Sequence, residues 1–299
     1  MHCFQRIKMW KALFVLALLF VEASLGLTGF RSEQAVADAF QRGFLSKFLP
    51  TTSTSRSGCL GLGCKNGSKV GRNGGAVPKI DLIFVLDSSG SVRQENFTVG
   101  KDMMKEIVDF VDQQAPISST GSRIACVSFS SPALTRTQFT FTANSNPAAV
   151  KTAIDGIKFD NGPSTATGVG LEKAKTVLDA ASGAGRVPLL WILTDGNKNS
   201  GKDPVPVANA LKVNSGVEIF GSPIGPRINL ASIEALVSTP IPDHIFEAQS
   251  FAAARRIANR AFTSFRNAHG LPSPTQGPPT LPPNFFANLL RNRLRKIGK

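Results

Sequence analysis

The sequence is poor in the residues that stabilise small metal-bound or disulfide-bound domains. Its 299 residues include four Cys and three His, too few for a zinc-finger array or a disulfide scaffold. Acidic residues are also scarce, with 20 Asp and Glu against 34 Lys and Arg. The chain is nevertheless 42% hydrophobic and only 18% charged. It is therefore too apolar to be disordered throughout, and long enough for one core of about 200 residues.

The excess of basic side chains lies outside the central part of the chain. Residues 80–266 contain 18 basic and 17 acidic side chains, whereas residues 28–79 contain 8 and 2, and residues 267–299 contain 5 and 0. A nucleic-acid-binding domain carries Lys and Arg on its own folded surface, so this distribution argues against nucleic acid as a partner. Basic flanks instead indicate appended segments that contact something acidic.

Long apolar runs are absent except near the start. Basic residues precede the apolar residues 12–21 and small residues follow them, which is typical of a secretory signal peptide over residues 1–27. The run is interrupted by Glu22 and is short for a permanent anchor, although an uncleaved anchor is the alternative. No later segment approaches about 18 consecutive apolar residues. The sequence therefore predicts a secreted protein with no transmembrane segment in its mature chain.

Several residues are candidates for the glycosylation and disulfide bonds that occur in secreted proteins. Asn66 and Asn96 begin Asn-X-Ser/Thr triplets and are candidate glycosylation sites. Cys59 and Cys64 lie in a Gly-rich stretch that is flexible enough to close a local disulfide. Cys126 lies in an apolar run, which favours a buried thiol, and a bridge to another molecule is the alternative.

The composition divides the chain around one central domain. Residues 28–50 form a short amphipathic segment, which we expect to pack on the domain, and residues 51–79 form a basic Gly/Ser-rich linker. Residues 80–267 are the predicted domain. Residues 268–299 begin with an extended Pro-rich linker and end in a basic amphipathic tail.

The central domain is predicted to be α/β. Near-continuous apolar stretches at 80–87 and 187–194 indicate strands buried on both faces of a sheet. Helices on both faces of a mostly parallel sheet provide that burial, with one antiparallel strand at the edge. The expected strands are 80–87, 122–130, 136–142, 187–194, 216–221 and 243–247. The expected helices are 94–112, 147–156, 166–181, 204–213, 230–237 and 249–267, after an N-terminal helix within 33–49.

Oxygen-bearing side chains follow the expected strands. Asp87, Ser89 and Ser91 alternate after the first strand, Asp195 ends a second, and Thr165 lies in the loop between them. Ligands bind an open parallel sheet at the carboxyl ends of its strands. Carboxylates and hydroxyls without His or Cys suit Mg²⁺ or Mn²⁺, with Ca²⁺ possible, and disfavour zinc. The cage is incomplete, so the sequence predicts a cation that bridges to an acidic group on a partner.

The three loops resemble the metal-ion-dependent adhesion site of the von Willebrand factor type A domain, a family that includes the integrin inserted domains. The resemblance covers about residues 79–267 and implies a Rossmann-like, doubly wound fold. It implies direct cation contact for Ser89, Ser91 and Thr165, partly water-mediated contact for Asp87 and Asp195, and a ligand carboxylate that completes the shell.

The resemblance also bears on the last expected helix and on the loop that contains Thr165. The expected helix 249–267 corresponds to the element that shifts in regulated relatives. The third loop departs from the pattern, because Pro163 and Ser164 stand where relatives usually carry glycine. Ser164 and Thr167 are therefore alternatives to Thr165.

An enzyme of this architecture is disfavoured. Acid-loop phosphotransferases need a second carboxylate at the position of Ser89, and the sequence contains no G-x-S-x-G, P-loop or G-x-G-x-x-G motif. His244 and His269 lie far along the chain from the loops, so no base for a nucleophilic serine is evident.

The sequence therefore predicts a secreted adhesion or matrix protein. Its expected partner is an extracellular matrix protein such as a collagen, bound through an acidic side chain. The alternative is that the basic flanks dock an acidic polysaccharide, a biomineral-associated matrix or an anionic membrane. Salt distinguishes the two, because flank binding weakens as salt rises and ignores EDTA.

Overall fold

The computed structural model describes residues 30–49, 77–181, 185–195, 199–226 and 228–271. The strands are β1 (Ile80–Asp87), β2 (Arg123–Phe129), β3 (Arg136–Phe139), β4 (Val187–Thr194) and β5 (Glu218–Pro223). The α-helices are α2 (Glu33–Gly43), α3 (Gln94–Gln114), α4 (Pro147–Asp155), α5 (Thr167–Ala181), α6 (Pro204–Asn214), α7 (Leu230–Glu234) and α8 (Phe251–His269). Short 3-10 helices are η1 (Leu45–Phe48), η2 (Pro132–Leu134) and η3 (Ile241–Asp243).

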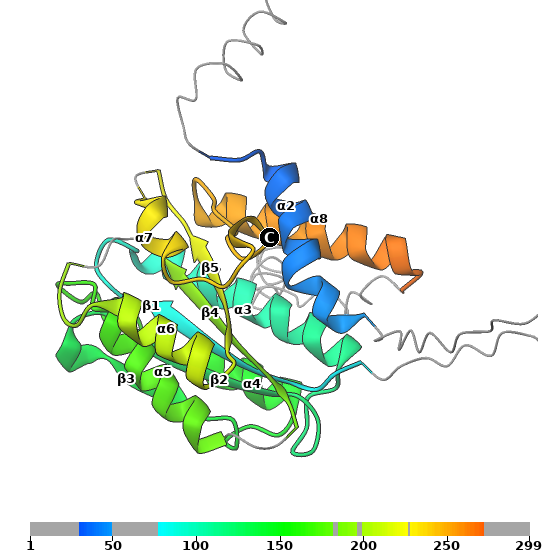
Figure 1. The fold of residues 1–299 in the computed structure, drawn as a ribbon, viewed down its shortest axis with the longest axis horizontal. Helices are drawn as coiled ribbons and strands as arrows, with labels where there is room; N and C mark the ends of the chain where they lie inside the picture. The colour runs from blue at the N-terminus through cyan, green and yellow to red at the C-terminus, as the bar shows by residue number, and fades with distance from the viewer. Residues whose placement is uncertain (1–29, 50–76, 182–184, 196–198, 227, 272–299) are drawn as a thin grey trace, which may run out of the picture. The chain divides into compact units, whose positions relative to one another are not determined.

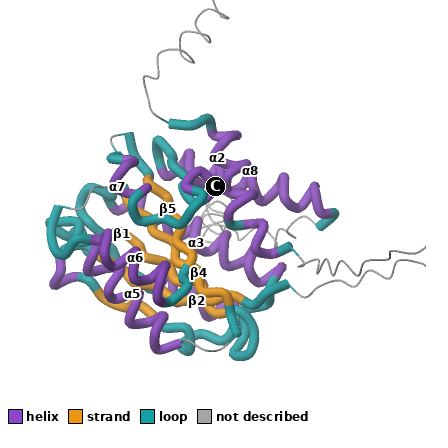
Figure 2. Tube along the Cα trace, in the orientation of Figure 1, coloured by secondary structure: helices purple, strands orange, loops and turns teal. Residues whose placement is uncertain are grey.

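The strands form one five-stranded sheet in the order β3-β2-β1-β4-β5 (Figure 1). β1 runs parallel to β2 and β4, and β4 runs parallel to β5. β3 is the antiparallel strand at the edge. Helices lie on both sides of the strands, as Figure 2 shows. This confirms the predicted fold class of a mostly parallel, doubly wound sheet with one antiparallel edge strand.

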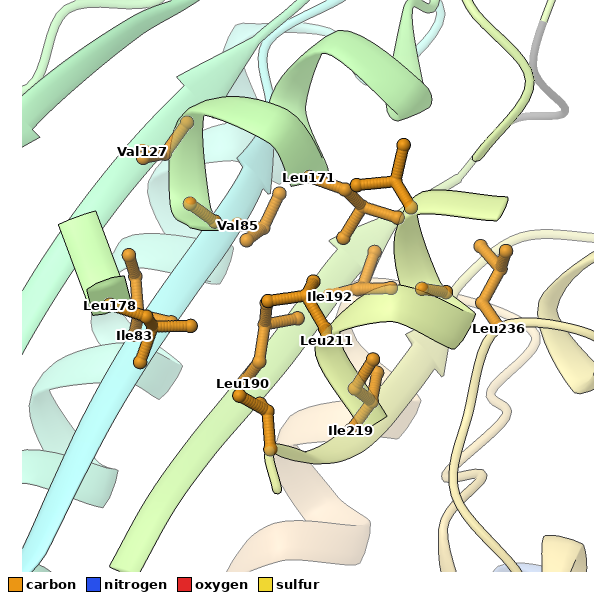
Figure 3. Close-up of a cluster of buried hydrophobic side chains, with 14 of the residues drawn as sticks. Ile83, Val85, Val127, Leu171, Leu178, Leu190, Ile192, Leu211, Ile219 and Leu236 are labelled. Carbon is orange, nitrogen blue, oxygen red and sulfur yellow. The ribbon is translucent and has the colours of Figure 1, made fainter. Parts of the chain in front are cut away.

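One face of the sheet is covered by α5 and α6. All eight residues of β1 are buried, and Ile83 and Val85 point to this face. Leu171 and Leu178 of α5 and Leu211 of α6 meet them in an aliphatic cluster (Figure 3). The cluster is mostly aliphatic, and Phe129 of β2 is its aromatic member from the strands.

The opposite face is aromatic and includes the N-terminal segment. Phe44 lies with its ring centroid 4.9 Å from that of Trp191 on β4 and 5.6 Å from that of Phe220 on β5. Phe40 is 5.4 Å from Trp191, and Phe48 contacts Phe110 of α3. α2 and η1 therefore complete the core of the domain from a position about 30 residues before β1 in the chain.

Ion pairs anchor the same segment at its ends. The Arg31 guanidinium donates to both carboxylate oxygens of Glu247, at 2.7 and 2.6 Å, and Glu247 is almost wholly buried. Lys47 lies 2.7 Å from Glu218, which also accepts a hydrogen bond from His244 Nε2. Paired charges at both ends orient the aromatic side chains between them.

The predicted strand at 243–247 is wrong. The segment makes two isolated parallel bridges, Gly221 to Ile245 and Ile224 to Ala248, and no continuous strand. Pro223 explains the gap, because it has no N–H to donate across the ladder between those bridges. The N-terminal helix lies within the expected range of 33–49, where α2 ends at Gly43 and η1 follows.

The remaining predictions concern Cys126, Asn96 and residues outside the described ranges. Cys126 is fully buried on β2 and is a free thiol, so the core alternative holds, and burial raises its pKa. Asn96 is half-buried in the first turn of α3, and its glycosylation stays a prediction. The signal peptide, Asn66, Cys59, Cys64, the linker and the basic tail lie outside the described residues, apart from their described ends at 77–79 and 268–271.

The compact unit that contains the sheet ends at Phe262, and the residues from Thr263 onward belong to a second unit that includes the end of α8. In the described part of the chain, no helix is both long and apolar enough to cross a membrane.

Candidate metal centre

Three loops meet at one edge of the sheet. Residues 88–93 follow β1, and Asp195 and residues 199–203 follow β4, which lies beside β1 and runs in the same direction. Residues 161–166 precede α5 and pair with the first loop through a bridge between Ser89 and Gly162. Adjacent parallel strands bring their carboxyl ends to the same edge, so all the predicted site residues lie in or beside these loops.

Asp87 is the buried member of the site, with only 1% of its surface exposed. Its Oδ1 accepts a hydrogen bond of 2.8 Å from the backbone N–H of Ser89. Its Oδ2 accepts one of 2.6 Å from the hydroxyl of Thr194 at the end of β4. Both oxygens are therefore held, and the carboxylate cannot rotate away from the loops.

Two serine hydroxyls connect the first loop to the last. Ser89 Oγ lies 3.1 Å from Ser91 Oγ, and Ser91 Oγ donates a hydrogen bond of 3.1 Å to Oδ1 of Asp195. Together with Asp87, four of the five predicted side chains form one connected group. Oxygens at these separations are close enough to share a small cation.

The loop that contains Thr165 is tied to the first loop through its backbone. The N–H of Gly90 donates to the carbonyl of Gly162 at 2.8 Å, and the N–H of Gly162 donates to the carbonyl of Ser88 at 3.2 Å. Gly162 has to be glycine because a Cβ there would lie 2.1 Å from Ser130 Oγ. Thr165 itself is 3% exposed, and its hydroxyl has no hydrogen-bond partner among the described residues.

Strained backbone flanks the same loops. The described residues other than glycine with positive φ are Arg93, at 66°, and Asn161, at 50°. Such conformations cost about 1–3 kcal/mol each and concentrate at functional sites. Both residues are exposed at the ends of site loops, which supports a function at this edge of the sheet.

Burial disfavours the negatively charged forms of both carboxylates in the site. Desolvation raises the pKa of Asp87 to about 6, although hydrogen bonds from Thr194 and Ser89 partly oppose the shift. Burial also raises the pKa of Asp195, against the hydrogen bond from Ser91. Each carboxylate would be more stable beside a positive charge. A divalent cation would supply that charge, so the residues present fit one.

The donor set favours hard cations. In the described ranges, no group of three or more His, Cys, Asp or Glu side chains is placed to hold a metal ion. The candidate centre consists instead of two carboxylates and the hydroxyls of Ser89, Ser91 and Thr165. Such oxygen ligands suit Mg²⁺, Mn²⁺ or Ca²⁺.

Three residues that support the site were not singled out from the sequence. Thr194 holds Asp87, Ser88 Oγ accepts a hydrogen bond of 2.7 Å from the Asp160 N–H, and Asn199 Oδ1 accepts one of 2.7 Å from the Thr165 N–H. The position of Thr194 directly before Asp195 is a signal that was available. No local signal pointed to Asn199, because its partner is 34 residues away.

Comparison with known proteins decides the family. The von Willebrand factor type A domain matches residues 81–260 of this chain, which is more than half of its length. The chain belongs to the von Willebrand factor type A domain family. Mouse matrilin-3 is 29% identical over 232 residues, which cover 75% of this chain and 43% of matrilin-3. The chain thus spans less than half of that relative.

Other members of the type A family extend the comparison. A rat protein with sushi, von Willebrand factor type A, EGF and pentraxin domains is 29% identical over 189 residues, which cover 61% of this chain and 5% of that protein. The solved structure of proximal thread matrix protein 1 from the mussel byssus has a TM-score of 0.56 at 23% identity. The match covers 64% of this chain and 48% of the mussel protein, and it shows the shared fold.

Proposed function

We propose that this protein is a secreted adhesion or matrix protein whose type A domain binds an acidic side chain of a protein ligand through a divalent cation. The observation that carries the proposal is the connected group of Asp87, Ser89, Ser91 and Asp195. Hydroxyl contacts of 3.1 Å join Ser89, Ser91 and Asp195 at the open ends of β1 and β4.

Each residue has a proposed role. The hydroxyls of Ser89, Ser91 and Thr165 contact the cation directly, and Asp87 and Asp195 contact it partly through water. The bound cation supplies a positive charge that attracts a carboxylate of the ligand. The two protein carboxylates leave a divalent ion with few negative ligands, so a further carboxylate is a favourable addition.

A binding function fits this chemistry better than an enzymatic one. The ring nitrogens of His244 lie at hydrogen-bond distance from the Pro240 carbonyl and from Glu218, at 2.8 and 2.7 Å. His244 is therefore engaged elsewhere and does not serve Ser89 or Ser91 as a base. We propose that the domain is not an enzyme.

The proposed ion is Mg²⁺ or Mn²⁺, with Ca²⁺ as a further candidate. One structure of the mussel thread matrix protein is described with zinc in its metal-ion-dependent adhesion motif, at 24% identity to this chain and a TM-score of 0.56. Oxygen-only ligands favour harder ions than zinc. Zinc nevertheless belongs in the set of ions to be tested.

The proposed partner is an extracellular matrix protein such as a collagen. The similarity to a thread matrix protein supports a place in the extracellular matrix. The alternative is that the basic flanks bind an acidic polysaccharide or a mineral-associated surface. The sequence supports that alternative through the charges of residues 28–79 and 267–299.

Solid-phase binding of the full mature chain tests the proposal. Immobilised collagens, other matrix proteins and acidic polysaccharides are probed in Mg²⁺, Mn²⁺, Ca²⁺, Zn²⁺ and EDTA. Asp87→Ala is compared with Asp109→Ala, a matched control whose carboxylate is 48% exposed and pairs with Lys151 on the surface. We expect binding to a protein ligand that is lost in EDTA and in Asp87→Ala alone.

Salt-sensitive binding that does not need the cation would contradict the proposal. Binding that survives EDTA and Asp87→Ala but falls as salt rises from 0.05 to about 0.5 M would reject the cation site as the main contact. It would assign the interaction to the basic flanks.

A further inference from the structure

The loop after β4 returns to contact the backbone of Thr165. Oδ1 of Asn199 accepts a hydrogen bond of 2.7 Å from the N–H of Thr165. The backbone N–H of Asn199 donates one of 3.1 Å to the carbonyl of Thr165. One residue therefore satisfies both main-chain polar groups of another, across 34 positions in the sequence.

Neighbouring contacts hold the two loops closely together. Ser200 Oγ donates a hydrogen bond of 2.9 Å to Ser164 Oγ. Lys202 forms an ion pair with Glu172 of α5. A Cβ on Gly168 would lie 2.2 Å from the Lys202 carbonyl oxygen, so glycine is needed for this approach. The position of Asn199 relative to Thr165 is thus determined by several independent contacts.

These contacts distinguish Thr165 from its alternatives. The Ser164 hydroxyl is engaged by Ser200, and Thr167 is the first residue of α5. The hydroxyls of Thr165 and Thr167 both have no hydrogen-bond partner among the described residues, and both residues are 3% exposed, but Asn199 holds the main chain of Thr165 alone of the three. A hydroxyl without a protein partner is available to contact a ligand.

We propose that Asn199 is a positioning residue for the cation site. Its side-chain oxygen holds the main chain of Thr165 so that the Thr165 hydroxyl faces the cation. This inference rests on the proposed function, because it assigns the residue that orients one ligand of the same site. Residues that orient metal ligands typically contribute about 10- to 100-fold to metal affinity.

The contact also closes a circuit among the three loops. The first loop is joined to the second by Gly90 and Gly162, and the third is joined to the first by Ser91 and Asp195. Asn199 and Ser200 supply the connections between the second loop and the third. Of these two, the Asn199 contact is the one that reaches the main chain of Thr165 itself.

Cation titration of the full chain tests the role of Asn199. Isothermal titration with Mg²⁺ and Mn²⁺ compares the wild type with Asn199→Ala, which removes the acceptor, and Asn199→Asp, which retains it. We expect Asn199→Ala to weaken cation affinity about tenfold and Asn199→Asp to restore most of it. Ser200→Ala is the matched control, because it removes the adjacent hydroxyl contact and leaves the Thr165 backbone held.

A double-mutant cycle separates positioning from a general structural effect. If Asn199 acts through Thr165, Asn199→Ala should not weaken cation affinity further when Thr165→Ala is already present. Thermal unfolding in EDTA shows whether each variant folds. Equal weakening by Asn199→Ala in both backgrounds would overturn the proposal, as would wild-type affinity in Asn199→Ala or an equally large loss in Ser200→Ala.

Failure of the proposed function has a different signature. A wild type that binds neither ion, with Asp87→Ala indistinguishable from it, would reject both the cation site and the role of Asn199. A wild type that binds and an Asn199→Ala variant that binds equally well would reject only the positioning role.

Discussion

The hydroxyl of Thr194 donates a hydrogen bond of 2.6 Å to Oδ2 of Asp87. The two residues end the adjacent parallel strands β4 and β1. The bond therefore links the two strand ends whose loops form the candidate metal centre. It also stabilises the charged form of a carboxylate that burial would otherwise neutralise.

Thr194→Val is predicted to weaken cation binding and to shift its pH dependence upward. The hydrogen bond from Thr194 lowers the pKa of Asp87, so its removal leaves the pKa still higher than about 6. A larger fraction of Asp87 is then protonated near neutral pH, and protons compete with the cation. Mg²⁺ titrations between pH 5 and 8 measure the shift. Thr194→Ser keeps the hydroxyl and should follow the wild type, and coincident profiles for Val and Ser would contradict the prediction.

Asp87→Asn is predicted to stabilise the cation-free domain while abolishing its response to Mg²⁺. The pKa of Asp87 is about 6 in the folded chain against an ordinary 3.8, so ionisation near pH 7.5 costs about 3 kcal/mol of folding free energy. Asn removes that cost. Urea unfolding in EDTA should show a gain of up to this size, and Mg²⁺ should then stabilise the wild type alone.

The sign of the pH dependence follows from the same pKa. Between about pH 6 and 3.8 the folded chain holds a proton on Asp87 that the unfolded chain has released. Acidification through this range therefore adds stability to the cation-free wild type relative to Asp87→Asn. The advantage of Asp87→Asn should shrink as pH falls, and an advantage that grows would show that Asp87 does not carry the cost.

Phe44→Ala is predicted to destabilise the domain by about 3–5 kcal/mol. Phe44 is fully buried against Trp191 and Phe220 although it precedes β1 by 36 positions. Urea unfolding of the full chain measures the loss, and Gln34→Ala, at an exposed position of α2, is the control. Equal stability of Phe44→Ala and the wild type would show that the segment does not belong to the folded core.

Glu218→Gln is predicted to cost about 1–2 kcal/mol at pH 7. Burial raises the pKa of Glu218, but hydrogen bonds from His244 and Lys47 outweigh it and lower the pKa below 4.5. A depressed pKa stabilises the folded chain above the unfolded pKa, and this contribution is lost as pH falls through the folded value. The cost of Glu218→Gln should therefore disappear in acid. Asp109→Asn, in a surface pair with Lys151, should change stability little at either pH.

Much of the fold was predictable because its signals are local. The apolar runs at 80–87 and 187–194 match β1 and β4 residue for residue. Five of the six predicted strands exist, and the antiparallel edge strand β3 lies within the expected strand 136–142. The failure at 243–247 has a specific cause, since apolar residues there face a strand in which Pro223 lacks an N–H. The hydrophobic pattern of one segment does not reveal whether the strand beside it can donate the hydrogen bonds that pairing needs.

The candidate site was likewise predictable from the sequence only in part. The identities of Asp87, Ser89, Ser91 and Asp195 were readable because each follows a strand whose end is evident from hydrophobicity. The contact of Asn199 with Thr165 was not, because it depends on two loops that approach each other only after the sheet has formed. The packing of Phe44 among aromatic side chains of β4 and β5 is equally non-local.

Composition and periodicity alone predicted a mostly parallel α/β domain with oxygen-bearing side chains at its strand ends, because burial and strand order impose local patterns on a chain. Tertiary structure decided which residue holds the main chain of Thr165, how far Asp87 was desolvated, and which aromatic side chains residues 30–49 pack against. These properties arise from distances between segments far apart in the sequence, and no local pattern records such distances. The pKa of Asp87 near 6 is one example, since the cost of its charge is set by the atoms that exclude water from it.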